Sequence, residues 1–327
     1  MKILLLTGPG GDAQGWGDMK VTESMREAAE SLGHPTRIAY VADESEFRRL
    51  VDKPDFDIAW SALYHITENE AFIGRNAGGT WVADVLDEKQ IPYIGSNSRT
   101  MRAMIDKFET HEILATAGVA VPAHVLLHSA DDASAVTYPA FVKPICESRS
   151  VGISDESVVH NEEELRRRVV FIEKEFDEPA LVEEFLPGDE YTALIVGNGR
   201  TRESLPGLVT VEDTHYGNYR ILRSDLRGVG LTRIGLAGAR TEEARQLGDD
   251  AAEAMGCLDH VRIDMRVDRN GKLRIIEVNG IPGLKPHKSW APQIYTLYHG
   301  SPLGEGEDYR QLIGAIVAAA GKRYGLV

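Results

Sequence analysis

Cysteine and positive charge are both scarce in this 327-residue chain. Its two cysteines, Cys146 and Cys257, are too few for a disulfide framework and show none of the Cys/His spacings of metal sites. A reducing cytoplasm is therefore the expected compartment. Acidic residues outnumber basic ones by 51 to 36, and the resulting net charge of −15 argues against broad binding to nucleic acid or to an anionic membrane.

Long hydrophobic runs are also absent. No stretch approaches the ~18 apolar residues of a membrane span. The apolar start over residues 3–6 stops at a glycine-rich turn, too early for a signal peptide, and a buried strand explains it better. The composition is that of an ordinary globular protein, with 43% hydrophobic and 27% charged residues, and the length predicts two or three domains.

The first 100 residues alternate between short apolar strands and amphipathic helices. Strands are predicted at residues 3–6, 36–41 and 57–61, and helices at residues 21–32, 44–51 and 81–88. This alternation predicts an α/β domain with a parallel sheet and helical crossovers.

Beyond residue 100 the predicted elements are of mixed type. Helices are predicted at residues 99–118, 161–175, 241–255 and 309–324, and extended segments at 119–128, 138–144, 179–186, 191–196 and 207–211. Residues 212–230 are polar and without periodicity, and so long an irregular connection is usually functional or disordered. We expect this segment to be a lid over a ligand.

A predicted hairpin at residues 261–278 carries the densest group of candidate site residues. At its centre, Asn270-Gly271 favours a two-residue type I′ turn, which would pair Arg269 with Lys272. Counting outward from this turn then fixes which side chains share one face of the hairpin.

Four polar side chains fall together on that face. Asp264 is predicted to lie opposite Glu277, and Arg262 opposite Asn279. Two adjacent carboxylates repel each other unless a cation or proton lies between them, and oxygen ligands suit Mg²⁺ or Mn²⁺. Such ions usually accompany phosphates, and a nearby arginine can stabilise charge that develops in phosphoryl or acyl transfer. The alternative is an exposed face with cross-strand salt bridges, but the Gly/Pro run at residues 280–283 favours a site.

The motif that begins at Glu277 and ends at Gly283 resembles the E-x-N-x-x-P-G signature of the D-alanine–D-alanine ligases, within the ATP-grasp superfamily. The similarity extends over roughly residues 90–285 in the family's order. It implies an N-terminal parallel-sheet domain followed by two ATP-grasp subdomains that clamp the nucleotide, at residues 1–100, 101–187 and 188–327. It also implies an ADP-forming ligase that joins a carboxylate to an amine through an acyl phosphate.

The resemblance assigns roles to the hairpin. Asp264, Glu277 and Asn279 would bind two Mg²⁺ ions, with Mn²⁺ as the alternative. Arg262, in a segment similar to the family's R-I-D, would stabilise the tetrahedral intermediate.

The same resemblance implies an ATP site. Lys107 follows a segment similar to the family's M-D-K, and Lys143 lies in a Val-Lys-Pro strand, so both would contact phosphates. Residues 181–186 are similar to the adenine-binding linker, and a following glutamate would bind the ribose. The implied ATP ligands are Lys107, Lys143, Glu183, Glu184, Phe185, Leu186 and Glu190.

Residues 147–152 resemble the family's phosphate-covering loop, where small residues let backbone N–H groups approach phosphate oxygens. Arg149 departs from this pattern and would either contact a phosphate or point outward. By resemblance, Ser150 would bond Tyr219 of the mobile loop and hold the site closed, with Tyr216 as the other candidate.

The chain departs from the family where the substrates would bind. The acidic residue that holds the first amino acid's amine has no clear counterpart, residues 64–70 and 76–80 replace an acidic, glycine-containing motif, and Asn218 replaces a phosphate-contacting lysine. Candidates to bind the second substrate's carboxylate are Gly283, Lys285, Lys288 and Ser289, with a basic loop at the domain edge as an equal alternative. An amino acid or small peptide other than D-alanine is therefore a serious hypothesis for the substrate.

Two other functions remain open. A nicotinamide dehydrogenase would use the glycine-rich turn at residues 8–11, but that turn is not a G-x-G-x-x-G sequence. A regulatory nucleotide-binding relative would lack part of the catalytic set, whereas all four hairpin residues are present. The resemblance also implies small-molecule amino acid or peptide substrates and a homodimer, with no nucleic-acid or membrane partner.

Overall fold

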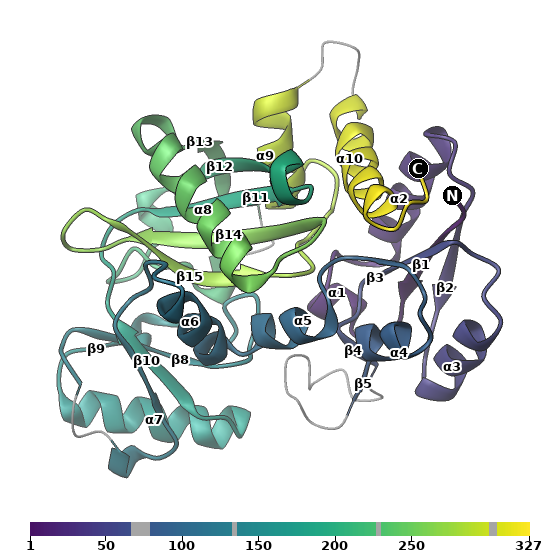
Figure 1. Ribbon diagram of the computed structural model, residues 1–327. Coiled ribbons are helices and arrows are strands. Elements are labelled where there is room, and N and C mark those ends of the chain that lie inside the picture. Colours follow the sequence, from purple (N-terminus) through teal and green to yellow (C-terminus); the bar gives the residue numbers. More distant parts are fainter. Residues whose placement is uncertain (67–78, 133–135, 227–229, 301–305) are drawn as a thin grey trace.

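The computed structural model describes residues 1–66, 79–132, 136–226, 230–300 and 306–327. These residues form an N-terminal unit (β1 to β6), a central unit (β7 to β10) and a C-terminal unit (β11 to β15), each built on its own sheet. Figure 1 shows the N-terminal sheet apart from the other two, which lie one above the other. Within the described ranges, no helix has both the length and the apolar character to cross a membrane.

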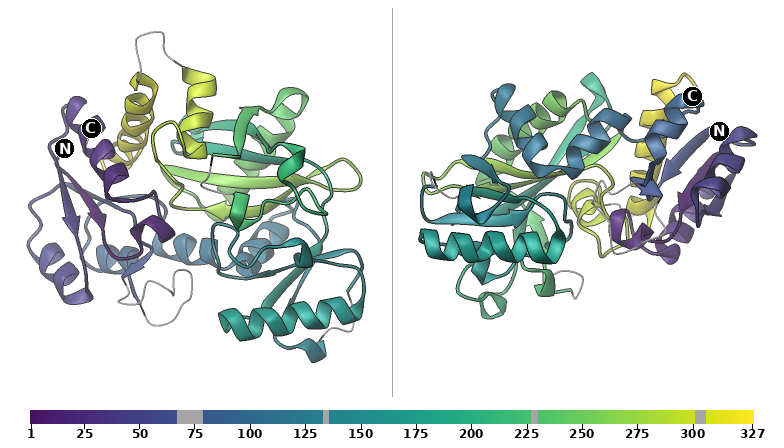
Figure 2. Two further views of the ribbon diagram at one scale, coloured as in Figure 1. Left: turned by 180° about the vertical axis from the view of Figure 1, so that it is seen from behind. Right: turned by 90° about the horizontal axis from the view of Figure 1, so that it is seen from below.

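The N-terminal unit contains the predicted parallel sheet. Its order is β2-β1-β3-β6, and every neighbouring pair is parallel. The strands are β1 (Ile3–Thr7), β2 (Thr36–Tyr40), β3 (Ile58–Ser61) and β6 (Tyr93–Ile94), with an antiparallel pair β4 (His65–Ile66) and β5 (Thr80–Trp81). The helices are α1 (Gly11–Gln14), α2 (Met19–Ser31), α3 (Glu44–Asp52) and α4 (Val82–Glu88). Strand β1 is buried throughout because side chains from helices pack against both faces of the sheet (Figure 2).

The single helix predicted over residues 99–118 is wrong, because the structure divides it into two. The two helices are α5 (Ser98–Ile105) and α6 (Lys107–Thr116). Asp106 between them has extended backbone angles, and its carboxylate accepts hydrogen bonds from the backbone N–H groups of Phe108 and Glu109. This cap starts a new helix and places Lys107 in its first turn, with the lysine side chain buried.

The central unit is an antiparallel sheet with one long helix against it. Its strand order is β7-β10-β8-β9. The elements are β7 (His124–Leu127), β8 (Ala140–Pro144), β9 (Val158–Val159), β10 (Ala180–Glu184) and α7 (Glu162–Phe176). Val142, Leu165 and Ile172 belong to a core of this unit, separate from the larger core that the other two units share.

The C-terminal unit is a five-stranded antiparallel sheet in the order β13-β12-β11-β14-β15. Its strands are β11 (Glu190–Val196), β12 (Glu203–Thr210), β13 (Arg233–Leu236), β14 (His260–Val267) and β15 (Leu273–Asn279), and its helices are α8 (Thr241–Met255), α9 (Trp290–His299) and α10 (Glu307–Arg323). Neither β13 nor α9 is predicted from the sequence.

The turn of the β14–β15 hairpin differs from the prediction. Its loop has three residues, Arg269 to Gly271, and the backbone N–H of Asp268 donates to the carbonyl of Lys272 at 2.7 Å. The Asp268 carboxylate stabilises this longer loop by accepting hydrogen bonds from the N–H groups of Asn270 and Lys272. Gly271 has the positive φ, 76°, that such a loop requires. The predicted pairing of Arg269 with Lys272 is therefore wrong.

A second irregularity restores the predicted register farther along the hairpin. The pairing shifts just after Asp264, where Ile276 is the extra residue on β15. Beyond this bulge, Asp264 pairs with Glu277 and Arg262 pairs with Asn279, as predicted. Two shifts of one residue cancel, so the four polar side chains share a face despite the different turn.

Helix α10 returns to the N-terminal unit and packs against α2 (Figure 1). Close to its end, the fully buried carboxylate of Asp259 joins three segments. It accepts hydrogen bonds from the Arg323 guanidinium at 2.6 Å, from the backbone N–H of Gly95 at 2.8 Å and from the Asn198 amide at 2.8 Å. The N-terminal unit and the C-terminal unit are therefore linked by hydrogen bonds to this carboxylate.

Candidate active site

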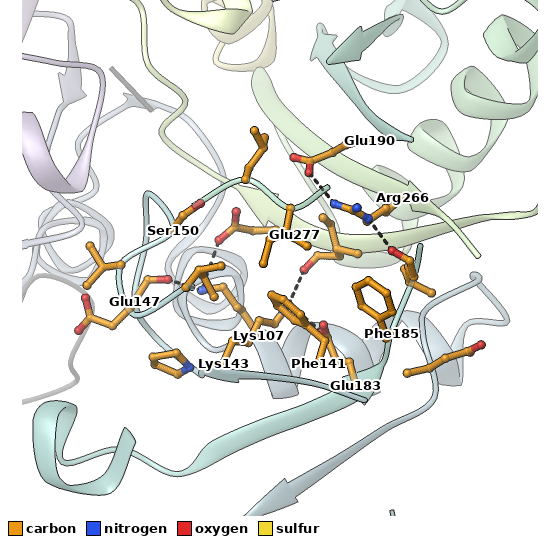
Figure 3. Close-up of a pocket in the computed structure, with 18 residues that line it drawn as sticks. Lys107, Phe141, Lys143, Glu147, Ser150, Glu183, Phe185, Glu190, Arg266 and Glu277 are labelled. Carbon is orange, nitrogen blue, oxygen red and sulfur yellow. Dashed lines mark hydrogen bonds and ion pairs between the residues drawn. The ribbon is translucent and has the colours of Figure 1, made fainter. Parts of the chain in front are cut away.

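A pocket, here called the first pocket, lies between the central and C-terminal sheets (Figure 3). Residues that line it include all seven predicted ATP ligands: Lys107, Lys143, Glu183, Glu184, Phe185, Leu186 and Glu190. Two more predicted site residues, Ser150 and Glu277, also line it. Other lining residues, to which no individual role is predicted from the sequence, include Phe141, Ile153, Ile221, Leu222, Arg266 and Ile276.

The two lysines of the first pocket are held by buried oxygen atoms. The Lys107 ammonium donates to the carbonyl of Glu147 at 2.6 Å and lies 3.3 Å from the Glu277 carboxylate. The Lys143 ammonium lies 2.7 Å from the Glu183 carboxylate and 3.3 Å from the carbonyl of Ile276, the bulge residue. Figure 3 shows the Lys107 ammonium between Glu147 and Glu277, and both lysines line the pocket. This side of the pocket is therefore cationic and suits an anion.

The opposite part of the first pocket combines apolar walls with a buried ion pair. Phe141 and Phe185 contribute aromatic rings that suit a planar heterocycle. The Arg266 guanidinium donates to the carbonyl of Leu186 at 2.7 Å and lies 3.3 Å from the Glu190 carboxylate. Arg266 therefore holds the segment predicted to read adenine next to the glutamate predicted to read ribose.

The loop after β8 faces two cavities. Ser150 lines the first pocket, whereas Ser148 and Arg149 line a second cavity described below. Arg149 donates to the carbonyl of Asp12 at 3.3 Å, so its side chain points away from the first pocket toward the N-terminal unit. Arg149 and Ser150 both have positive φ, 57° and 60°, which orients their backbone N–H groups differently from those of an extended strand.

Residues 212–226 cover part of the first pocket through Ile221 and Leu222. The hydroxyl of Tyr219 lies 2.6 Å from Nε2 of His160, and the Tyr219 ring contacts the ring of Phe185 edge-on. The His160 ring also stacks on the Tyr219 ring. Tyr219 is therefore paired with His160 and not with the predicted Ser150. The other candidate, Tyr216, lines a different cavity, which shares Glu190, Leu222 and Arg266 with the first pocket.

The predicted carboxylate patch forms where the first pocket meets the second cavity. Arg262 makes two parallel hydrogen bonds to Asp264, each 2.9 Å long, and the Asn279 amide donates to the same carboxylate at 3.2 Å. Thr192 on β11 donates to Asp264 at 2.7 Å. Glu277, opposite Asp264, faces the first pocket, while Arg262 and Asn279 face the second cavity.

The second cavity lies between the N-terminal and C-terminal units and has a volume of about 660 Å³. Its lining includes all four predicted substrate residues: Gly283, Lys285, Lys288 and Ser289. Ser289 precedes α9, and its hydroxyl accepts a hydrogen bond from the backbone N–H of Lys285 at 3.0 Å. The Trp290 ring lies 5.0 Å from the Arg262 guanidinium. This cavity therefore brings the substrate candidates close to the polar patch.

The N-terminal wall of the second cavity supplies acidic residues that the sequence analysis did not identify. Asp12 and Asp18 both line it. Asp18 caps α2 by accepting a hydrogen bond from Val21 N at 3.1 Å, and Lys285 lies 3.9 Å away. The replaced motif at residues 64–70 and 76–80 falls largely outside the described residues, so only its ends are placed.

Tyr64, at one of those ends, contacts the signature segment directly. Its hydroxyl accepts a hydrogen bond from the backbone N–H of Ile281 at 3.0 Å. Burial raises the pKa of Tyr64 to about 12, so the hydroxyl keeps its proton at neutral pH. The Tyr64 hydroxyl thus fixes the chain just after Asn279, on the wall shared with the second cavity.

Known proteins resemble this chain over almost its whole length. Residues 113–318 match the family model described as D-ala D-ala ligase C-terminus. A D-alanine–D-alanine ligase of Halalkalibacterium halodurans is 29% identical over 325 residues, covering 97% of this chain and 98% of the relative. One from Alcanivorax borkumensis is 29% identical over 269 residues, covering 82% and 78% of the two chains. The structure of D-alanine–D-alanine ligase from Bacillus anthracis complexed with ATP superimposes with a TM-score of 0.68 at 18% identity, covering 100% of this chain and 99% of that one.

Fold and site together define an ATP-dependent ligase of the ATP-grasp class, which forms an amide bond. Within that class, the chain belongs to the D-alanine–D-alanine ligase family. The comparisons give no support to the dehydrogenase or to the regulatory alternative.

Proposed function

We propose that this protein activates the carboxylate of an amino acid or small peptide as an acyl phosphate and joins it to the amine of a second amino acid. The observation that carries the proposal is the meeting of two cavities at one polar patch. The first pocket combines apolar walls with two lysines, as a nucleotide requires, and the second cavity holds the residues proposed to bind substrate. Arg262 and Asn279 line the second cavity beside Glu277 of the first.

In this proposal, Lys107 and Lys143 hold the ATP phosphates, and the pocket around Phe185 holds the adenine. The γ-phosphoryl group would then be transferred to the substrate carboxylate, with ADP as the leaving group. The amine attacks the acyl carbon, Arg262 stabilises the oxyanion that forms, and phosphate leaves as the amide forms. Ser289 and Lys285 would hold the carboxylate of the second substrate.

We further propose that Asp264, Glu277 and Asn279 hold Mg²⁺. The fit rests on their donor atoms, since two carboxylates and an amide oxygen suit a hard cation and share one face of the hairpin. Among the described residues, no group of three or more His, Cys, Asp and Glu side chains forms a metal site by itself. The nucleotide phosphates would accordingly supply the remaining ligands of Mg²⁺, and the ion would neutralise their charge.

The substrates themselves are proposed from the shape of the second cavity. The relatives of this chain are named as D-alanine–D-alanine ligases. A volume of about 660 Å³ lies within the ~300–1,000 Å³ of pockets for much larger ligands, so the cavity has room for side chains longer than a methyl group. We therefore propose amino acids larger than D-alanine, or small peptides, as substrates alongside D-alanine.

ADP release is the decisive measurement for the proposed function. Wild-type protein with Mg-ATP would be tested against L- and D-amino acids and their dipeptides, singly and in pairs, with mass spectrometry of the product. Glu277→Gln should abolish release, whereas Glu163→Gln, at an exposed ion pair on α7, should not change it. No release with any pair, while ATP still binds, would overturn the ligase assignment.

Three broader features also remain proposals. The three larger sheets support domains at residues 1–100, 101–187 and 188–327. Two unpaired cysteines, Cys146 and Cys257, support a cytoplasmic location. A homodimer rests on the family resemblance, and light scattering on the purified protein would test it.

A further inference from the structure

Three buried polar or charged side chains, those of His111, Glu183 and Lys143, form a linear chain of contacts in the wall of the first pocket. One oxygen of Glu183, Oε1, lies 2.7 Å from the Lys143 ammonium and 2.6 Å from Nε2 of His111. The side chains of His111, Glu183 and Lys143 are 0%, 4% and 8% exposed, so water cannot replace these contacts. Neither the sequence analysis nor the proposed function gives His111 a role.

The protonation of this chain follows from its surroundings. Burial alone would raise the pKa of Glu183, but the Lys143 ammonium and the hydrogen bond from His111 outweigh it and hold that pKa at about 2. An ionised carboxylate can only accept hydrogen bonds, so Nε2 of His111 is the donor. Burial lowers the pKa of His111, which leaves a neutral ring with its proton on Nε2. Its other nitrogen, Nδ1, is buried and has no hydrogen-bond partner among the residues that the structure describes.

Helix α6 connects this chain of contacts to the second lysine. Lys107 and His111 are four residues apart and so lie on one face of the helix. Lys107 reaches the first pocket directly, 3.3 Å from Glu277, and His111 reaches Lys143 through Glu183. The helix therefore sets the positions of both ammonium groups relative to each other.

We propose that His111 is a positioning residue that orients Glu183, and that Glu183 holds the Lys143 ammonium in place for the nucleotide. This inference rests on the proposed function, in which Lys143 contacts ATP. It adds to the role that the family resemblance implies for Glu183, because Oε1 contacts both His111 and the lysine while Glu183 still lines the first pocket. Without the His111 donor, the carboxylate keeps, among the described residues, only Lys143 as a partner, and it is free to rotate and draw the ammonium out of the pocket.

The test compares two substitutions at one position. His111→Leu removes the donor, whereas His111→Gln keeps an N–H group at a similar distance from the backbone. Loss of one hydrogen bond to a charged group should raise the KM for ATP about 10- to 100-fold in His111→Leu. The kcat at saturating ATP and the KM for the amino acid substrates should not change, and His111→Gln should recover most of the ATP affinity.

A neighbouring histidine supplies the control. The His124 ring lies edge-on to that of His111 at 5.0 Å and bonds to the carbonyl of Pro122 and to Glu112. His124 pairs with Glu183 across strands β7 and β10, but its two ring nitrogens bond elsewhere. His124→Leu therefore disturbs the same packing without removing a hydrogen-bond donor from Glu183, so its KM for ATP should equal that of the wild type. An equal rise in KM for His124→Leu and His111→Leu would overturn the proposal, because the effect would then come from packing alone.

Lys143→Met separates this inference from the proposed function. If Lys143→Met does not weaken ATP binding, the proposed nucleotide site itself is wrong. If Lys143→Met weakens ATP binding but His111→Leu does not, or if His111→Gln is as weak as His111→Leu, only the positioning role is wrong.

A measurement on the unmodified protein covers the case in which the leucine variant does not fold. Nitrogen-15 NMR of the histidine rings should find His111 in the Nε2–H tautomer with and without ATP. The Nδ1–H tautomer would overturn the proposal, since Nε2 could then donate nothing to Glu183.

Discussion

Removing one hydroxyl group, in Tyr64→Phe, should slow the reaction without changing the fold. In the native protein that hydroxyl accepts the backbone N–H of Ile281 at 3.0 Å, two residues beyond Asn279. Phenylalanine fills the same space but leaves this N–H without a partner. An unsatisfied N–H costs about 1–3 kcal/mol, and the signature segment should shift to find another acceptor. If the shift displaces groups that act in the transition state, kcat/KM should fall roughly 5- to 150-fold.

The assay for Tyr64→Phe is ADP release with the best amino-acid pair from the substrate screen. The matched control is Tyr93→Phe in the same unit, where the hydroxyl donates to Asp87 at 2.9 Å. The control should lose some stability but keep its kcat/KM. Wild-type kinetics in Tyr64→Phe, or an equal loss in both variants, would refute the reasoning, because the hydrogen bond to Ile281 would then be irrelevant to catalysis.

Three further predictions concern stability, the phosphate loop and the lid. Burial lowers the pKa of His260 from 6.5 to about 4, so the unfolded chain binds the extra proton first. Protonation of His260 in the unfolded chain should lower the free energy of unfolding by about 2 kcal/mol as the pH falls from about 7.5 to about 5. Urea titrations at the two pH values should show this loss in the wild type, and a loss smaller by about 2 kcal/mol in His260→Phe. Gly152→Ala should raise the KM for ATP, because φ is +75° and a Cβ would meet Phe176 at 3.0 Å; Gly118→Ala, also at positive φ but in open space, should leave that KM unchanged. Shortening residues 212–226 should mainly lower turnover, and unchanged turnover would rule out a lid.

The polar patch could be predicted from sequence because, in a hairpin, the distance of each residue from the turn determines which residue it pairs with. The prediction succeeded at Asp264 and Glu277 although the turn was wrong, since the bulge at Ile276 offset the longer loop. The same period-two reasoning extended by two residues would have found Arg266, which follows Arg262 and Asp264 on alternate positions.

Other features depend on information that local patterns do not carry. Tyr64 bonds a residue 217 positions away, and no spacing rule predicts such a contact. Helix α9 was not predicted, and Pro292 lies in its first turn, where proline is tolerated. The division at Asp106 was predictable in principle, because an aspartate before a helical segment is a common N-cap.

The hydrogen bonds that Asp259 accepts from Arg323 and Gly95 have a consequence for how the protein opens. Because the N-terminal unit and the C-terminal sheet share one core and one buried carboxylate, they should move as a single body. The central unit has its own core, so it is the part free to swing. The nucleotide would then enter the first pocket between the moving central unit and the static C-terminal sheet. The amino acids would enter the second cavity, most of whose walls belong to the two units that do not move. Exchange of ATP, more than exchange of amino acids, should depend on that swing.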